Sequence, residues 1–451
     1  MNLKNWLFSK NKDSGIAPAG INETVKNYYL NEIAEWRDIY CGGGEWRFTR
    51  KGGIHGGIRR MNASNAAKSL CAELSALCFA EQAEIKTGNE NTENYLREVL
   101  DDNSFWTCFP LFLEKMFALG GGVIKTYHSG GKVKLDYIDA EHFLPVQYDE
   151  KRIYSGIIIS ETQKENASFI LAEYHEKAAD GYVITNRLYK SAHNSLRYNK
   201  AELSELYPKL APRTEIKGAD NPMFSYFKPA CANAHNNSPF GVSVFAGCTD
   251  TLKSLDVVFD SLEREFVLGK KRIIVPVSAI KGNYDENGKL QRYFDTNDEV
   301  FQALSADDSE ELKITDNSAQ LRVTEHREAI EQLLDLLCMQ TGLSAGALSY
   351  RGEAAKTAAE IIARENKTHR TKTAHRQLIR ESMIIMIKNI LMLGASLGKI
   401  SQSDYENSGA EVVFADGIAS DNNSKIDNAL KLFSAGIIDR EQALSAIYNT
   451  D

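Results

Sequence analysis

The feature that most constrains the fold is a pair of long amphipathic helical segments on either side of a short mixed segment. The first helix is predicted within 241–269, where apolar residues recur at spacings of three and four positions. This helix would have about 27 residues and would span roughly 40 Å at the rise per residue of an α-helix. The second is predicted over 323–342. Residues 270–322, between them, read as a small β-like module. The apolar faces consist of Phe245, Leu252, Leu255, Phe259, Leu262 and Phe266 in the first helix and Ile330, Leu333, Leu334 and Leu337 in the second.

A glycine-punctuated loop follows the second helix and leads into the longest predicted helix. Gly342, Gly346 and Gly352 mark the loop, and helical periodicity then continues to about residue 394, roughly 60 Å if straight. Both ends of this helix are apolar, but its middle, "RENKTHRTKTAHRQ", is basic and has no apolar stripe. A helix that is polar all round is solvated, or it bridges to something outside its own core.

The region before the first long helix has a different pattern. Several amphipathic helices are followed by alternating apolar residues around Ser129-Gly130-Gly131, a β-hairpin signal, and by further strands to about Lys190. Residues 1–240 are therefore predicted to be α+β, with helices first and an antiparallel sheet after them. At the other end of the chain, two short helices are predicted, and Asp439 with Gln442 forms a capping-box signal.

Charge and cysteine content exclude some classes of protein. The formal net charge of −8 excludes a protein that binds nucleic acid through a general excess of basic residues. Cys71 and Cys78 lie seven positions apart among leucines, which indicates reduced core cysteines. Because no run of 18 apolar residues occurs, no membrane span is expected.

No arrangement of residues typical of catalysis stands out. A phosphate-binding P-loop needs Gly-Lys followed by Ser or Thr, but Gly352 is followed by Glu353. His369 and His375 are six positions apart, on opposite sides of a helix, so they cannot share a metal. We therefore predict no enzymatic activity, no cofactor and no metal site.

Three separated strings resemble portal proteins of tailed bacteriophages, in particular the group from phages of Gram-positive hosts. Residues 238–276, which begin "SPFGVSVFAG", are similar to the stem helix and the start of the clip. Residues 341–379, "TGLSAGALSYRGEAAKTAAEIIARENKTHRTKTAHRQLI", resemble the tunnel loop and long helix, and 412–448 are similar to the crown. The resemblance runs in order from about Ile33 to the end and is weakest in 150–235.

The resemblance implies an α+β phage portal fold with wing, helical stem, small α/β clip, tunnel loop with long helix, and helical crown. The expected divisions are a wing over 1–240, stem helix 1 over 241–269, a clip over 270–322, stem helix 2 over 323–342, a tunnel loop over 343–355, a long wing helix over 356–397 and a crown over 398–451.

The same resemblance implies a structural role in a virion. Such proteins form a ring, usually of twelve subunits, at one vertex of the capsid, and assemble in the host cytoplasm. Double-stranded DNA passes through the ring during packaging and ejection without sequence-specific contacts. The terminase large subunit and later a head-completion or adaptor protein dock on the ring, next to major capsid and scaffold proteins.

Three sets of side chains are candidate site residues under this interpretation. The DNA-facing set, in or just after the tunnel loop, is Tyr350, Arg351 and Lys356. A basic belt on the long helix, which would face DNA or a neighbouring subunit, is Lys367, Arg370, Lys372, Arg376 and Arg380. The clip docking surface is Lys271, Arg272, Asp285, Asp298, Asp307, Asp308 and Glu310.

Each set also has a plainer interpretation. The loop is then a turn between helices, and the basic belt and the acidic residues are solvated faces. The acids of the two stem helices, which include Asp256 and Asp260, are expected to face the channel or its outside. Alternative functions are another structural component of a phage or phage-like particle, or a nucleic-acid enzyme subunit such as a nuclease or helicase.

Overall fold

The computed structural model describes residues 30–51, 58–79, 83–192, 198–234, 238–269, 273–274, 282–284, 290–292, 315–316, 320–349, 358–414, 430–434, 439–440 and 442. The chain has an α+β fold, as the sequence predicts. It forms two compact units. The larger combines 1–44, 65–249 and 338–451, and the smaller combines 45–64 with 250–337.

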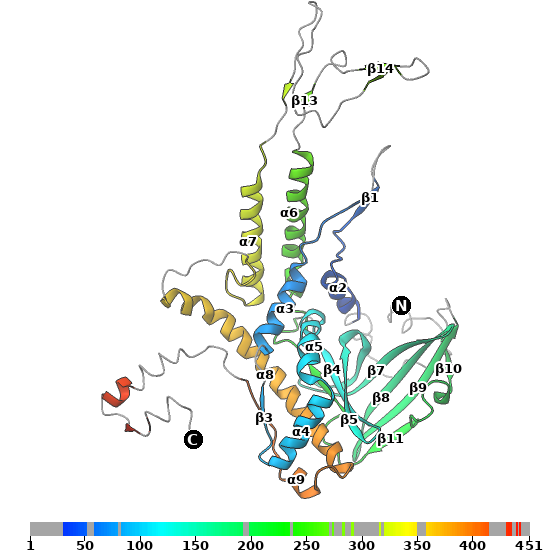
Figure 1. Cartoon of the computed structure of the whole chain (residues 1–451). Coiled ribbons are helices and arrows are strands. Elements are labelled where there is room, and N and C mark those ends of the chain that lie inside the picture. The colour runs from blue at the N-terminus through cyan, green and yellow to red at the C-terminus, as the bar shows by residue number, and fades with distance from the viewer. Residues whose placement is uncertain are drawn as a thin grey trace, which may run out of the picture. The chain divides into compact units, whose positions relative to one another are not determined.

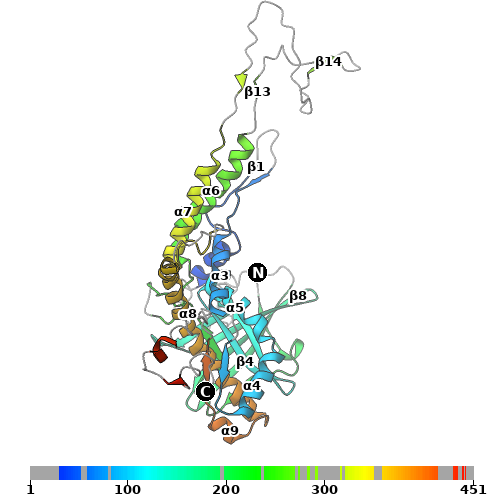
Figure 2. The same cartoon turned by 60° about the vertical axis from the view of Figure 1, so that its left-hand side comes forward.

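The smaller unit is built on two helices, α6 (Thr249–Leu268) and α7 (Val323–Thr341), which run side by side (Figure 1; Figure 2). They are antiparallel: Arg322, just before α7, donates to Glu265 near the end of α6, and the Nε–Oε1 and Nη2–Oε2 distances are both 3.0 Å. The strands of this unit form three small antiparallel pairs. These are β1 (Thr49–Lys51) with β2 (Ile58–Arg60), β13 (Ile273–Ile274) with β16 (Thr315–Asp316), and β14 (Gly282–Tyr284) with β15 (Leu290–Arg292).

The larger unit contains most of the helices. They are α2 (Leu30–Tyr40), α3 (Ala66–Phe79), α4 (Glu90–Asp102), α5 (Phe105–Leu119), α8 (Ala358–Ser396) and α9 (Gln402–Glu406). Local signals set their ends: the Asn89 side chain caps the start of α4, and Gly120, with φ +77°, ends α5 in the left-handed region.

Antiparallel sheets complete the larger unit (Figure 1). The main sheet has the order β10–β9–β8–β7–β6, and β11 also pairs with β9. A second sheet has the order β12–β4–β5, and β17 pairs with β3. The strands are β3 (Glu84–Lys86), β4 (Gly122–Ser129), β5 (Lys132–Asp139), β6 (Phe143–Tyr148), β7 (Ile153–Lys164), β8 (Ala167–Ala178), β9 (Gly181–Ala192), β10 (Asn199–Ala201), β11 (Arg213–Ile216), β12 (Phe224–Phe227) and β17 (Glu411–Val413). Short 3₁₀ turns lie at Ala140–His142, Leu203–Glu205 and Ala246–Cys248.

The core of the larger unit is aromatic where α3 and α5 meet the β12–β4–β5 sheet. The Phe109 ring stacks on Phe105, with centroids 4.6 Å apart, and meets Phe79 and Phe227 edge-on. The second half of α8 adds a fully buried apolar stripe, as its sequence predicts. That stripe is Ile379, Met383, Met386, Ile387, Ile390 and Leu391. Burial of such side chains contributes about 1.5–3 kcal/mol each.

Local sequence signals agree with the structure at several places. The β4–β5 hairpin turns at Gly130 and Gly131, both with positive φ, as a two-residue turn of this kind requires. Cys71 and Cys78 are buried on α3. The capping box is confirmed: Gln442 N donates to Asp439 Oδ1 at 2.7 Å, and Asp439 N donates to Gln442 Oε1 at 3.2 Å.

The start of the first long helix differs from the prediction. α6 begins at Thr249, and 241–245 are not helical. A tertiary contact explains the difference, because Val244 N donates to Phe117 O at 3.1 Å and Gly241 lies directly against the carbonyl of Gly120. These backbone groups are paired outside the helix, so helical periodicity in 241–248 does not decide their conformation.

Candidate functional site

The described part of the glycine loop is tied to the middle of α8. Gly342 has φ +80°, and its carbonyl accepts from Thr371 Oγ1 at 2.7 Å. Ser344 N donates to Thr368 Oγ1 at 2.9 Å, and the intervening Leu343 is buried. The polar middle of α8 therefore binds the start of the loop. The sequence showed only that this part of the helix has no apolar stripe, and did not predict this role.

Two of the three predicted sets lie outside the described residues. Tyr350, Arg351 and Lys356 belong to the part of the loop and helix start that the structure does not describe. The same holds for every member of the predicted clip surface, namely Lys271, Arg272, Asp285, Asp298, Asp307, Asp308 and Glu310. Both sets remain predictions.

The predicted basic belt does not occupy one face of α8. Because successive residues turn by about 100°, Lys367 and Arg370 lie roughly 60° apart, whereas Lys372 and Arg380 point to the other side of the helix. Lys367 Nζ donates to the carbonyl of Met339 at 2.9 Å, in the last turn of α7, where a cation is favourable. Arg370 and Arg380 are exposed, and Lys372 is half-buried.

Arg376 is the member that differs most from the prediction. Its side chain is buried, Nε donates to the carbonyl of Cys78 at 2.9 Å, and the guanidinium lies 5.1 Å from the centroid of the Phe414 ring. This arginine therefore joins α8 to α3 inside the larger unit. It is not part of an exposed belt, because the orphan carbonyl at the end of α3 and an aromatic face bind it from within.

Two acids of α6 are also placed differently from the expectation that they face a channel or its outside. Asp256 and Asp260 are buried, with 2% and 6% of their surface exposed. Asp256 accepts from Trp46 Nε1 at 2.8 Å, Arg47 Nη2 at 2.7 Å, and both N and Oγ of Ser64 at 2.8 Å. The sequence contained a signal for this, since Asp256 lies four positions after the buried Leu252 and thus on the same helix face.

Large apolar side chains remain exposed on α6. Phe259 and Phe266, which belong to the predicted apolar stripe, are 40% and 49% exposed. Val257, Val267 and Leu268 are exposed as well. A helix that presents several such residues to solvent is typical of a surface that contacts another molecule.

A buried charged cluster in the larger unit was not predicted at all. Lys125 Nζ lies 3.0 Å from Glu173 Oε1 and 3.1 Å from Asp136 Oδ2. Burial alone would lower the pKa of Lys125, but the two carboxylates outweigh it and hold that pKa above its usual value. For the acid Glu173, burial alone would raise the pKa, but His175 and Lys125 hold that pKa below its usual value. The cluster pairs its charges internally and joins β4, β5 and β8.

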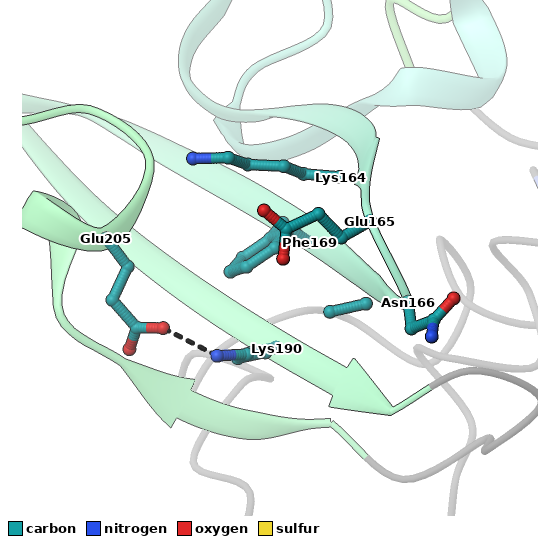
Figure 3. A pocket seen from close by; sticks show the side chains of 7 residues that line it. Lys164, Glu165, Asn166, Phe169, Lys190 and Glu205 are labelled. Carbon is teal, nitrogen blue, oxygen red and sulfur yellow. Dashed lines mark hydrogen bonds and ion pairs between the residues drawn. The ribbon is translucent and has the colours of Figure 1, made fainter.

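A separate pocket of about 300 Å³ lies at the β7–β8 turn, and Figure 3 shows the side chains that line it. Lys164 and Glu165 line one side of it, and Lys190 and Glu205 form an ion pair of 2.8 Å on the other. Cations and carboxylates alternate there, so the pocket does not select for an anion or a cation. No member of the Lys125 cluster lines it.

Within the described ranges, no group of three or more His, Cys, Asp or Glu side chains is arranged to hold a metal ion. Among the helices of the same residues, none is long and apolar enough to cross a membrane.

Comparisons with known proteins give a family match and distant structural similarities. The model of the family described as "Phage portal protein, SPP1 Gp6-like" matches residues 21–451. No curated protein matches the chain. Among solved structures, the chain is similar to one titled "Virion of native gene transfer agent (GTA) particle", at 10% identity and a TM-score of 0.43, over 84% of this chain and 88% of that one.

Proposed function

The chain belongs to the SPP1 Gp6-like family of phage portal proteins, and from this premise we propose that it forms the ring through which double-stranded DNA enters and leaves a phage or phage-like capsid. The ring stands at one capsid vertex of the virion. It serves as a passive conduit and as a docking platform for the terminase large subunit and then a head-completion or adaptor protein, alongside major capsid and scaffold proteins. The match of the family along 21–451 carries this proposal.

Two features support a ring through which DNA slides. The exposed phenylalanines and neighbouring apolar side chains of α6 suit contact with another subunit, because single chains rarely expose such a group of residues. The formal net charge of −8 on each chain would make the assembled ring acidic overall, so it would repel phosphate and let DNA slide rather than grip it.

We assign the wing to the described sheets and helices of 30–234, the stem to α6 and α7, and the tunnel loop to the segment between α7 and α8. Tyr350, Arg351 and Lys356 would contact passing DNA. The start of that loop is held by Thr368 and Thr371, which would keep its base fixed while DNA moves.

Electron microscopy of the purified protein tests the ring. We expect rings of about twelve subunits with a central hole, formed by the protein alone or on co-expression with its capsid and scaffold proteins. A chain that stays monomeric at every concentration, and in that co-expression too, would refute the proposal.

A DNA-packaging assay tests the loop contact. The double variant Arg351→Ala/Lys356→Ala is expected to package or retain less DNA while its rings remain intact. Lys399→Ala, which removes an exposed cation elsewhere in the larger unit, is the control. Unchanged packaging and retention in the double variant would leave the loop as a structural turn.

A further inference from the structure

The β1–β2 hairpin has one face turned toward α6. Its register places Arg50 opposite Arg59 and Lys51 opposite Ile58. Side chains alternate between the two faces of a strand, so Arg50 and Arg59 share a face with Phe48, whose ring lies 4.5 and 5.0 Å from their guanidinium groups. Arg59 also pairs with the buried Asp260. Arg59 therefore attaches this face to α6, whereas Arg50 is exposed.

The opposite face of the hairpin is exposed. It carries Thr49, Lys51, Ile58 and Arg60, and Ile58 is 73% exposed. Neither Lys51 nor Arg60 forms an ion pair with any residue that the structure describes. The whole segment 45–64 has five Arg and Lys residues but one acid. An exposed isoleucine between two cations suits an acidic protein surface.

The outward face of α7 has the complementary charge. Its exposed residues Glu325, Glu328, Gln332 and Asp335 follow one another at spacings of three and four, so they form one helix face. In both views α7 and β1 lie on opposite sides of α6 (Figure 1; Figure 2). The smaller unit thus has a basic edge and an acidic edge on opposite sides.

The two edges also lie at the same level along the helix pair. Asn62, which follows β2, donates its N–H to Asp260 on α6 at 3.0 Å. On the antiparallel α7, Glu328 follows Arg322, the partner of Glu265, by six residues, or about 9 Å of helix rise. Glu328 is therefore level with about residue 259 of α6, close to the point where the hairpin is attached.

We propose that the exposed hairpin face of one subunit docks on the acidic face of α7 in the next copy of this chain. Lys51 and Arg60 pair with Glu325 and Glu328 of the neighbour, and Ile58 is covered. The inference rests on the proposed ring, with its axis along α6 and α7. A contact between two different edges is head-to-tail, and a head-to-tail contact closes into a ring when its rotation allows.

A protein partner fits this face better than DNA does. DNA phosphate would bind the cations but would leave Ile58 without an apolar contact. Asn62, which follows the hairpin, also donates to the carboxylate of Glu263 on α6, and this negative charge would repel a phosphate backbone.

A charge-swap experiment on the full-length chain tests the contact. The variants are Lys51→Glu/Arg60→Glu, Glu325→Lys/Glu328→Lys, and all four changes together. Lys209→Glu/Lys217→Glu is the matched control, since it makes the same charge change at exposed sites of the larger unit. Native mass spectrometry and sedimentation velocity measure the concentration at which half of the protein is in rings.

Each reversal alone should raise that concentration by at least about tenfold, because like charges then face each other, and the combined variant should restore it. The control should match the wild type. If rings form normally with both reversals, this inference is wrong but the proposed function stands. The same holds if the hairpin reversal lowers DNA retention and leaves ring formation unchanged. A wild type that forms no ring overturns both.

Disulfide cross-linking tests the contact even if a charge reversal unfolds the hairpin. The variant Arg60→Cys/Glu328→Cys does not reverse the charge of either surface, and Cys41→Ser removes an exposed native cysteine. Oxidation should give a ladder of linked subunits on a non-reducing gel, whereas either single cysteine should not. A double-cysteine protein that forms rings but stays unlinked would overturn the contact.

Discussion

Replacement of Asp256 by Ala is the most informative single change in the smaller unit. The carboxylate accepts four hydrogen bonds from Trp46, Arg47 and Ser64, and thus attaches 45–64 to α6. The change would leave the Arg47 guanidinium buried without its counter-charge, and Arg47 Nε and Nη1 already have no hydrogen-bond partner among the described residues. The indole N–H and the Ser64 amide would lose their acceptor as well.

The expected loss of stability is large. Removal of one partner of a buried ion pair costs about 3–5 kcal/mol. Individual hydrogen bonds to a charged group are worth about 1.5–3 kcal/mol, but several to the same carboxylate do not add. We therefore expect a loss of about 3–5 kcal/mol, or a rise of roughly 10²- to 10⁴-fold in the opening equilibrium. Asp256→Asn, which keeps one acceptor oxygen, should cost about 1.5–3 kcal/mol.

Hydrogen exchange followed by mass spectrometry measures this directly. Amides of 58–64 and of α6 should lose protection in Asp256→Ala, while the buried half of α8 should not. Asp250→Ala is the matched control, because Asp250 is exposed in the first turn of α6 and should cost only about 0.3–1 kcal/mol.

A double substitution separates the buried charge from simple loss of packing. Arg47→Met/Asp256→Leu should recover much of the stability, since apolar side chains can replace a buried ion pair at little net cost. If Asp256→Ala exchanged like Asp250→Ala, with 58–64 still protected, the idea that this carboxylate holds the hairpin on α6 would be wrong.

Three further predictions concern the larger unit. Burial lowers the pKa of His375 to about 4. As the pH falls, this histidine is therefore protonated in the unfolded chain before it is protonated in the folded one, and the free energy of unfolding should fall by about 3 kcal/mol between pH 6.5 and 4. Denaturant unfolding of His375→Gln should show a flatter dependence of stability on pH. Glu173→Gln should cost about 3–5 kcal/mol by leaving Lys125 buried and partly unpaired, and Lys125→Met/Glu173→Leu should recover most of it in the same assay. Gly342→Ala should cost about 1–3 kcal/mol, measured as a lower melting temperature, because φ is +80° and its Cβ would lie 2.5 Å from Thr371 Oγ1; Gly398→Ala, at positive φ but in open space, should cost less.

For much of the candidate site, the sequence predicted where it lies in the order of helices and strands but not which side chains form it. The order of the helices and the β-like segments pointed to the portal family, and the family match along 21–451 agrees. The side chains themselves were harder to assign. Arg370 and Arg376 each follow a histidine in the same helix, yet Arg376 is buried against Phe414 and Arg370 is exposed.

The sequence by itself determined the features that depend on near neighbours along the chain. The apolar stripe of α8, the Gly130-Gly131 turn and the Asp439–Gln442 capping box all follow from spacings of two to four residues, where backbone geometry decides which groups meet. Tertiary structure alone decided what surrounds each polar side chain. Arg47 meets Asp256 across 209 positions, and Lys125 meets Glu173 across 48. Local spacing can place a carboxylate on an apolar helix face, as it does for Asp256, but it does not show which distant segment covers that carboxylate or which group pairs with it.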